Sequence, residues 1–279
     1  MKFHGSFPAL ITPFTKEKKI NYIELNQLAE MHMHHSDGLV LCGSTGEGWL
    51  LSLEEKLQVI KNVQHVFKKP IIVNSCVWSA DDFLSFVKAV DHLTNNIEAF
   101  LVAAPPYLKL NERQTLQFYK VCAEASPKPI IVYHIPSRNN IEFTNDLMDF
   151  FNDHPHIIGI KETRWSHIED YIHLSNMIQF AGDDEFIGSS LIQSSINVGG
   201  NLFPEIFSQY PHTFPWQDWQ KLLNMAANPL VIKVLMAHHG LIEHAACRDP
   251  LGEVPPSLAQ QIINVFQSTV QNNVFAHGY

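Results

Sequence analysis

IIGIKE, residues 157–162, is a short apolar run that ends in a lysine and a glutamate. Its β-branched residues are typical of a strand that is buried on both faces of a parallel sheet. Burial disfavours the charged form of a lysine, so Lys161 is expected to be neutralised, paired, or kept as an amine that forms a Schiff base with a carbonyl. Taken alone, a strand-end lysine more commonly reaches solvent, and the rest of the chain decides between these alternatives.

Similar apolar runs recur along the chain and alternate with stretches of helical spacing. Strands are predicted at residues 7–12, 39–42, 71–74, 100–103, 130–133, 157–161, 178–181 and 195–198. Helices are predicted between them at 22–34, 53–66, 80–92, 112–125 and 145–151. Strand and helix alternate with a period of about 30 residues, which builds a parallel sheet. Eight such units favour an α/β fold of the closed (β/α)₈ TIM-barrel type over an open doubly wound sheet.

The pattern becomes mostly helical from about residue 203 onward. Helical segments are predicted at 215–227, 230–242 and 257–271, separated by prolines. We therefore expect a catalytic barrel over residues 1–202 and a C-terminal helical appendage over residues 203–279. The chain has no low-complexity segment or charge block that would form a flexible linker.

Composition and charge exclude several classes of function. The net charge of −9 gives no electrostatic footprint for nucleic acid or an anionic membrane, so small-molecule partners are expected. The first residues lack a signal peptide's apolar core, which favours a cytoplasmic protein. The four cysteines contain no C-x-x-C pair, and the sixteen histidines contain no H-E-x-x-H spacing. Free thiols and ordinary histidines are expected, without a metal site.

Residues whose side chains or backbone could react or bind a ligand follow the predicted strands. GSTGEG at 43–48 comes after the second strand, PPY at 105–107 after the fourth, YHIPSR at 133–138 ends the fifth, and Lys161 ends the sixth. In a barrel these strand ends converge on one face. The glycine-rich stretch suits a small anion such as a carboxylate, and it lacks the lysine of a phosphate loop. Tyr133 can shuttle protons and Arg138 can bind a carboxylate, although packing and surface roles are the common ones for these residue types.

Four motifs together resemble one family. GSTGE at 43–47, YHIPSR at 133–138, GIKE at 159–162 and AGDD at 181–184 have the order and spacing of the dihydrodipicolinate synthase family. The resemblance spans residues 5 to about 250. It implies a (β/α)₈ barrel that forms a lysine Schiff base with pyruvate or a related 2-oxo acid, as class I aldolases do. The superfamily also contains N-acetylneuraminate lyases and 2-keto-3-deoxygluconate aldolases.

The resemblance implies a role for each matching residue. In the proposed catalytic set, Lys161 is the Schiff-base nucleophile and Tyr133 the proton shuttle, relayed through Ser44 and through Tyr107 of a neighbouring subunit. In the substrate-binding set, Thr45 holds the pyruvate carboxylate, Gly182 and Ile196 line the pyruvate side, and Arg138 orients the aldehyde. No metal or organic cofactor is implied, because the protonated imine supplies the electrophilic activation. A homotetramer, or at least a dimer, is implied.

Arg138 favours the synthase branch, because the sugar-acid lyases generally lack an arginine there. The expected reaction is that of a carbon–carbon bond-forming lyase. It condenses pyruvate with L-aspartate 4-semialdehyde, which gives the precursor of diaminopimelate and lysine. Two alternatives stay open: a sibling aldolase acting on a sugar acid, and a catalytically silent barrel that binds a 2-oxo acid or a protein partner.

The chain also departs from the family pattern. Ser44 replaces the usual threonine, His134 stands where asparagine is common, Asn139 and Asn140 replace Thr-Gly, and the loop after Asp184 is shorter, which bears on Ile196. The C-terminal region is shorter too.

Lysine-inhibited members of the family that this chain resembles have a polar allosteric cleft, and at the matching positions this chain carries Trp49, Lys56 and Pro106. Because a lysine repels the ammonium groups of L-lysine, weak or absent inhibition by L-lysine is expected.

Overall fold

The computed structural model describes residues 3–93, 96–164, 174–187, 192, 194–210 and 212–271. In this part of the chain eight parallel strands form one sheet, in the spatial order β1-β8-β7-β6-β5-β4-β3-β2. The strands are β1 (Gly5–Pro8), β2 (Leu39–Leu41), β3 (Ile71–Asn74), β4 (Ile97–Ala103), β5 (Ile130–His134), β6 (Ile157–Glu162), β7 (Ile178–Ala181) and β8 (Ser194–Asn197).

The two edges of this sheet meet beside β1. An isolated parallel bridge joins Ala9 to Val40, and the Leu10 N–H donates to the Val40 carbonyl at 2.9 Å. Since β1 also pairs with β8 along its length, the sheet curls into a nearly closed barrel. The predicted (β/α)₈ fold is confirmed. Closure explains the continuous apolar runs, because a barrel strand is covered by side chains inside and by helices outside.

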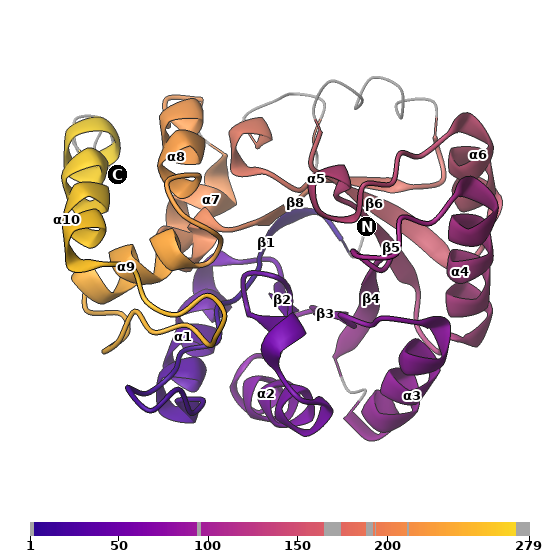
Figure 1. Ribbon diagram of the computed structural model, residues 1–279, viewed down its shortest axis with the longest axis horizontal. Helices are drawn as coiled ribbons and strands as arrows, with labels where there is room; N and C mark the ends of the chain where they lie inside the picture. Colours follow the sequence, from indigo (N-terminus) through magenta and orange to yellow (C-terminus); the bar gives the residue numbers. More distant parts are fainter. Residues whose placement is uncertain are drawn as a thin grey trace.

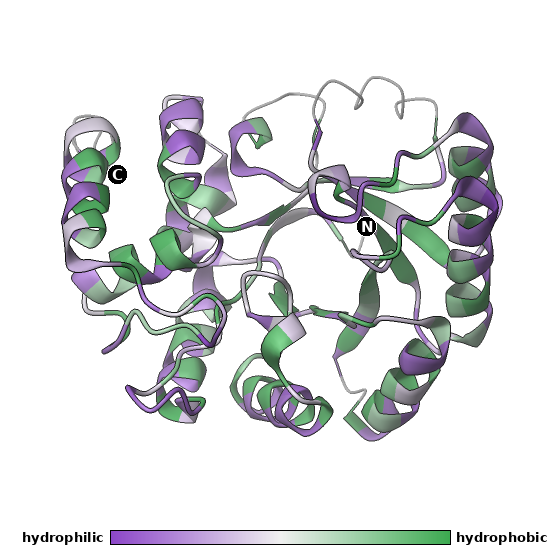
Figure 2. Ribbon diagram, in the orientation of Figure 1, coloured by the Kyte–Doolittle hydropathy of each residue, from purple (hydrophilic) through white to green (hydrophobic). Residues whose placement is uncertain are grey.

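Helices surround the barrel. They are α1 (Tyr22–His35), α2 (Leu53–Val66), α3 (Ala80–Val90), α4 (Glu112–Ala125), α6 (Asn145–Asp153) and α7 (Pro204–Gln209). Figure 1 shows α1, α2, α3, α4 and α6 along the outer side of the strands. Polar side chains set several helix starts: Ser52 and Glu55 form a reciprocal capping box on α2, and Asn111 and Gln114 form one on α4. In Figure 2 the strands are mostly green, whereas purple collects on outward helix faces.

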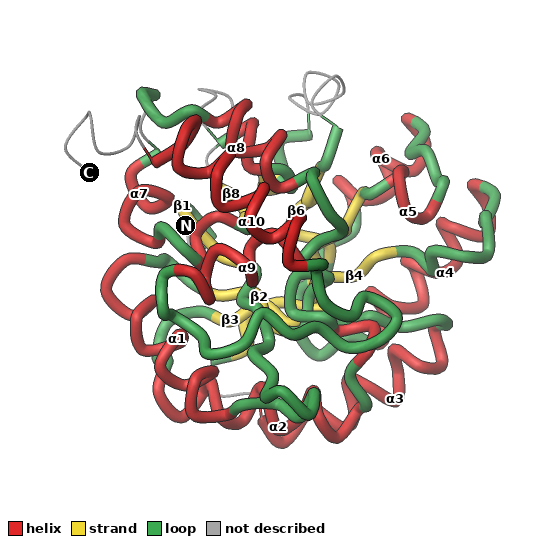
Figure 3. Tube along the Cα trace, turned by 60° about the vertical axis from the view of Figure 1, so that its left-hand side comes forward, coloured by secondary structure: helices red, strands yellow, loops and turns green. Residues whose placement is uncertain are grey.

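The C-terminal segment adds α8 (Trp216–Leu223), α9 (Leu230–His238), α10 (Pro256–Val265) and a π-helical stretch over Phe266–Gln271. Figure 1 shows α8, α9 and α10 grouped beside the barrel, and they stay together when that side is turned forward in Figure 3. Every residue of α9 from Leu230 to Met236 is buried, which marks a helix enclosed on all sides. The division at residue 202 stays a prediction, and residues 272–279 lie outside the described ones.

Some element bounds differ from the predicted ones. The first strand was predicted at 7–12 but spans Gly5–Pro8. The last bond to β8 is from the Ala9 N–H to the Asn197 carbonyl at 2.8 Å, and the Ile11 N–H donates to the Asn201 side chain instead. Helix α3 ends at Val90, ahead of a 3₁₀ turn over Asp91–Leu93. Two short helices, α5 (Pro136–Asn139) and α7, escaped prediction since each is too short to show a helical period.

Among the described residues, no helix has the length and apolarity needed to cross a bilayer. The same residues contain no group of three or more His, Cys, Asp and Glu side chains arranged to hold a metal ion. The described cysteines 42, 76, 122 and 247 are all buried free thiols.

Candidate active site

A cavity of about 460 Å³ opens at the carboxyl ends of the strands. Its wall combines the loops after β2, β5 and β7 with strand β8 and the segment from Gln220 to Ile232. Seven of the eight predicted site residues line it, namely Ser44, Thr45, Tyr133, Arg138, Lys161, Gly182 and Ile196. The eighth, Tyr107, is 82% exposed and does not line this cavity. Residues from five different strand ends or loops are thus gathered around one space.

Lys161 and Tyr133 face each other on neighbouring strands. They are register partners in the β5–β6 pair, and the Lys161 Nζ lies 4.3 Å from the centre of the Tyr133 ring. Both side chains are buried. Within the described part of the chain the Lys161 side-chain nitrogen has neither an ion pair nor a hydrogen bond. Of the alternatives for a buried lysine, the arrangement therefore favours an amine that is available to a ligand.

The loop after β2 carries Ser44 and Thr45 into the cavity. A Cβ on Gly48 would lie 1.8 Å from the Cys42 carbonyl oxygen, so the loop can close only with glycine at that position. The Asn228 side-chain amide donates to the Thr45 Oγ1 at 3.0 Å. Because the Thr45 oxygen accepts this bond, its own O–H proton is directed elsewhere and can be donated to a bound carboxylate.

Arg138 lies on the single turn of α5 at the cavity wall. Pro136 begins this turn, and Asn140 ends it in the left-handed conformation at φ +54°. The Arg138 side chain is exposed and makes no hydrogen bond with any described residue. Its planar donor fork is thus free to bind a carboxylate that enters from outside.

Gly182 and Ile196 line the part of the cavity wall that β7 and β8 form. The Gly182 N–H donates to the Glu162 carbonyl at 2.7 Å, and a Cβ on Gly182 would lie only 2.6 Å from that oxygen. Ile196 is fully buried in β8. The shorter loop before it falls partly on residues 188–191 and 193, which lie outside the described residues.

Asp183 is a cavity residue that the sequence reasoning missed. Burial raises its pKa to about 6, while the nearby Lys161 and Arg138 charges oppose the increase. Its carboxylate forms no hydrogen bond with the described residues, unlike that of Asp184, which accepts from the Val198 and Gly199 backbone and from the Trp219 ring. The AGDD motif was the available signal, since an acidic residue directly after a barrel strand faces the site.

A second buried pair lies directly behind the Lys161–Tyr133 pair. His134 Nδ1 and Glu162 Oε2 are 2.6 Å apart, and both residues are buried. The His134 ring stacks on Phe143 with ring centres 4.1 Å apart. His134 and Glu162 are also register partners, so this contact links β5 and β6 one residue beyond the site.

A sequence model of the dihydrodipicolinate synthetase family matches residues 2–269 of this chain. The chain belongs to this family. Among curated family members, a 4-hydroxy-tetrahydrodipicolinate synthase of Chlamydia trachomatis serovar D is 31% identical over 252 residues, covering 87% of each chain. That of Thermodesulfovibrio yellowstonii is 28% identical and covers 95% of this chain and 98% of its own.

Solved structures of the dihydrodipicolinate synthetase family agree with the fold. The chloride-inhibited dihydrodipicolinate synthase of Acinetobacter baumannii, solved in complex with pyruvate, superposes with a TM-score of 0.85. It is 27% identical, and the match covers 96% of this chain and 99% of that one. The synthase of Methylacidiphilum fumariolicum SolV, at 22% identity and a TM-score of 0.88, shows the same fold.

Proposed function

We propose that this protein is a 4-hydroxy-tetrahydrodipicolinate synthase, a lyase that condenses pyruvate with L-aspartate 4-semialdehyde through a Schiff base on Lys161. The observation that carries the proposal is the buried Lys161 amine, 4.3 Å from the Tyr133 ring centre at the wall of a cavity. The names of the relatives and the exposed Arg138 guanidinium at the cavity support the choice of substrates.

The proposed reaction starts at the pyruvate ketone. The neutral Lys161 amine attacks the ketone carbon, and water leaves to give an iminium. The iminium draws electrons from the neighbouring methyl carbon, which loses a proton to form the enamine. The enamine carbon then adds to the aldehyde carbon, and the aldehyde oxygen takes up a proton. The substrate's own amine finally displaces Lys161 and closes the ring.

The chain's other residues bind and move protons in this proposal. Tyr133 exchanges protons at the imine nitrogen and the ketone oxygen, relayed through Ser44 and the partner copy's Tyr107. Thr45 donates its hydroxyl proton to the pyruvate carboxylate, and Gly182 and Ile196 bound the pyruvate side. Arg138 binds the carboxylate of the semialdehyde. No metal or organic cofactor is needed for these steps.

The proposal includes a homo-oligomer, a tetramer or at least a dimer, and a cytoplasmic location. The exposed Tyr107 supports the first part, because a relay residue outside its own chain's cavity needs a neighbouring copy. The buried free thiols are compatible with a reducing compartment.

Borohydride trapping tests the nucleophile. Wild-type protein incubated with pyruvate and borohydride should gain the mass of a reduced pyruvate adduct on Lys161. Lys161→Ala should gain none, and an undiminished adduct in that variant would reject the assignment.

A coupled assay tests the second substrate. Pyruvate-dependent conversion of aspartate semialdehyde, followed by nicotinamide oxidation through a reductase, should proceed in the wild type and fall steeply in Arg138→Ala. An adduct without semialdehyde turnover would favour a sugar-acid aldolase. Pyruvate binding without any adduct would favour the silent barrel.

A further inference from the structure

A buried ion pair connects the loop over residues 43–48 to the C-terminal helices. No step of the proposed reaction uses this pair. The Lys233 Nζ on α9 lies 2.5 Å from the Glu47 Oε1, and both side chains are fully buried. Lys233 also donates to the Ala246 carbonyl at 2.9 Å and lies over the Phe14 ring at 4.3 Å. Glu47 follows Ser44 and Thr45 by three and two residues.

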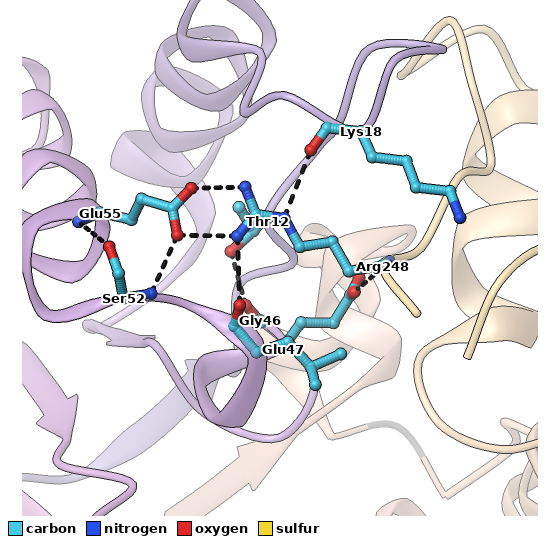
Figure 4. A network of polar contacts seen from close by, with 8 residues as sticks. Thr12, Lys18, Gly46, Glu47, Ser52, Glu55 and Arg248 are labelled. Atoms are coloured by element: carbon cyan, nitrogen blue, oxygen red, sulfur yellow. Dashed lines mark hydrogen bonds and ion pairs between the residues drawn. The ribbon is translucent and has the colours of Figure 1, made fainter. Parts of the chain in front are cut away.

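The second Glu47 oxygen is held from the same region. It accepts the Arg248 backbone N–H at 2.9 Å. Figure 4 shows the Arg248 side chain facing Glu55, which it binds through two nitrogens at 2.7 and 2.5 Å. Arg248 donates further to the carbonyls of Leu50 and Lys18. Arg248 is therefore itself fixed against the start of α2 when its backbone binds Glu47.

The Glu47 backbone shapes the turn that presents Ser44 and Thr45. Glu47 has φ +56°, a left-handed conformation that is uncommon for a residue with a side chain. Its N–H donates to the Ser44 carbonyl at 3.1 Å, and the Gly48 N–H donates to the Gly43 carbonyl at 2.9 Å. The Thr12 hydroxyl binds the Gly46 carbonyl at 2.6 Å on the same turn (Figure 4). A side chain tied at both oxygens thus keeps an unfavourable backbone conformation in place.

Stability alone is a poor reason to bury such a pair. Replacing a buried ion pair with apolar side chains of similar volume is often neutral or stabilising, because desolvation offsets the attraction between the charges. Strained backbone conformations also gather at functional sites, where surrounding contacts hold them.

We propose that Glu47, Lys233 and Arg248 are positioning residues for the pyruvate end of the reaction. They fix the 43–48 turn so that the Thr45 hydroxyl, itself bound by Asn228, meets the pyruvate carboxylate. The C-terminal helices thereby set pyruvate affinity while the barrel strands supply the reacting groups. This inference rests on the proposed pyruvate-dependent activity.

The test is the double variant Glu47→Gln/Lys233→Met. It removes both charges together, so neither residue is left as a buried charge without its partner. The pyruvate concentration that gives half-maximal borohydride-trapped adduct should rise by at least about tenfold, the affinity that the loss of one hydrogen bond to a carboxylate removes. KM for the semialdehyde should stay at the wild-type value, a split that general destabilisation would not produce.

The matched control is Asp218→Asn/Lys221→Met, which removes an exposed ion pair from α8 by the same kinds of substitution. It should leave both KM values unchanged. If the Glu47/Lys233 double variant fails to fold, Glu47→Gln/Lys233→Gln provides the test instead, because it also removes both charges and keeps amide groups that can hydrogen-bond to each other. We expect it to raise the pyruvate requirement several-fold.

A folded Glu47 variant with the wild-type pyruvate requirement would overturn the inference, and so would a parallel rise in both KM values. An absent adduct in the wild type would instead reject the proposed function. The two failures are thus distinguishable.

Discussion

Asp183 shows how a single residue is placed at the expense of stability. Its carboxylate lines the cavity and makes no hydrogen bond with the described residues, and burial raises its pKa from 3.8 to about 6. Ionisation is therefore less favourable in the folded protein than in the unfolded chain. The contribution of Asp183 to stability is fully present below about pH 4 and is lost as the pH rises through about 6.

Asp183→Asn should accordingly stabilise the protein at pH 8 and leave it unchanged at pH 4. The expected gain at pH 8 is about 3 kcal/mol, the free energy equivalent of the pKa shift. Urea unfolding of both proteins at the two pH values measures it. Equal stability at pH 8 would show that the carboxylate is not penalised by burial.

Paired strands hold the reacting groups at the scale of elements. The β5–β6 register places Tyr133 beside Lys161, and one residue further it places His134 beside Glu162. The His134–Glu162 contact of 2.6 Å is buried, and the Arg164 backbone N–H also binds Glu162 at 2.6 Å. The second pair therefore locks the ends of the two strands that carry the first.

His134→Ala should lower the free energy of unfolding by about 3 kcal/mol, because it removes one partner of a buried Glu162 carboxylate. His134→Asn should lower it less, since its side-chain amide can still donate a hydrogen bond. Urea unfolding compares the three proteins. An alanine variant as stable as the wild type would contradict a locking role for the pair.

At the scale of the whole molecule, several large apolar side chains are exposed on its surface. Tyr107 is 82% exposed, Leu108 56% and Trp78 53%. A second copy that covers this region would place its Tyr107 at the neighbouring site, as the proposed relay requires.

Subunit mixing tests this assembly. Lys161→Ala and Tyr107→Phe should each have low activity alone. Co-expression should restore activity, because in a mixed dimer the Tyr107→Phe subunit keeps Lys161 and receives Tyr107 from its partner. Random pairing gives about a quarter of sites with both residues intact. Activity equal to the sum of the separate variants would show that Tyr107 does not act across an interface.

The contacts of Lys56 and Trp49 bear on inhibition by L-lysine. The buried Lys56 ammonium donates to the carbonyls of Ser75 at 2.8 Å and Cys76 at 3.3 Å, and Trp49 packs edge-on against Trp78 at 4.9 Å. A second ammonium here would meet a charge of the same sign. The initial rate should therefore be nearly unchanged by sub-millimolar L-lysine, and strong inhibition in that range would contradict the prediction.

Local sequence patterns predicted much of the fold. The strands at residues 71–74 and 178–181 and the helices at 53–66 and 112–125 have the predicted bounds. Uninterrupted apolar runs and side-chain caps are encoded within a few residues, so the bounds of such strands and helices can be predicted from local sequence. Helix α5, with four residues, offers no period to read.

The sequence by itself determined the alternation that builds the barrel and placed Lys161, Tyr133 and the 43–48 loop at strand ends. It could not show that Asn228 binds Thr45 or that Lys233 binds Glu47, contacts that span 183 and 186 residues. Nor did it show that Asp183 is partly buried at the cavity and forms no hydrogen bond with the described residues. Only the tertiary structure decided these points, because a local pattern fixes the direction of a side chain, whereas its burial and its partner depend on how distant segments pack around the closed barrel.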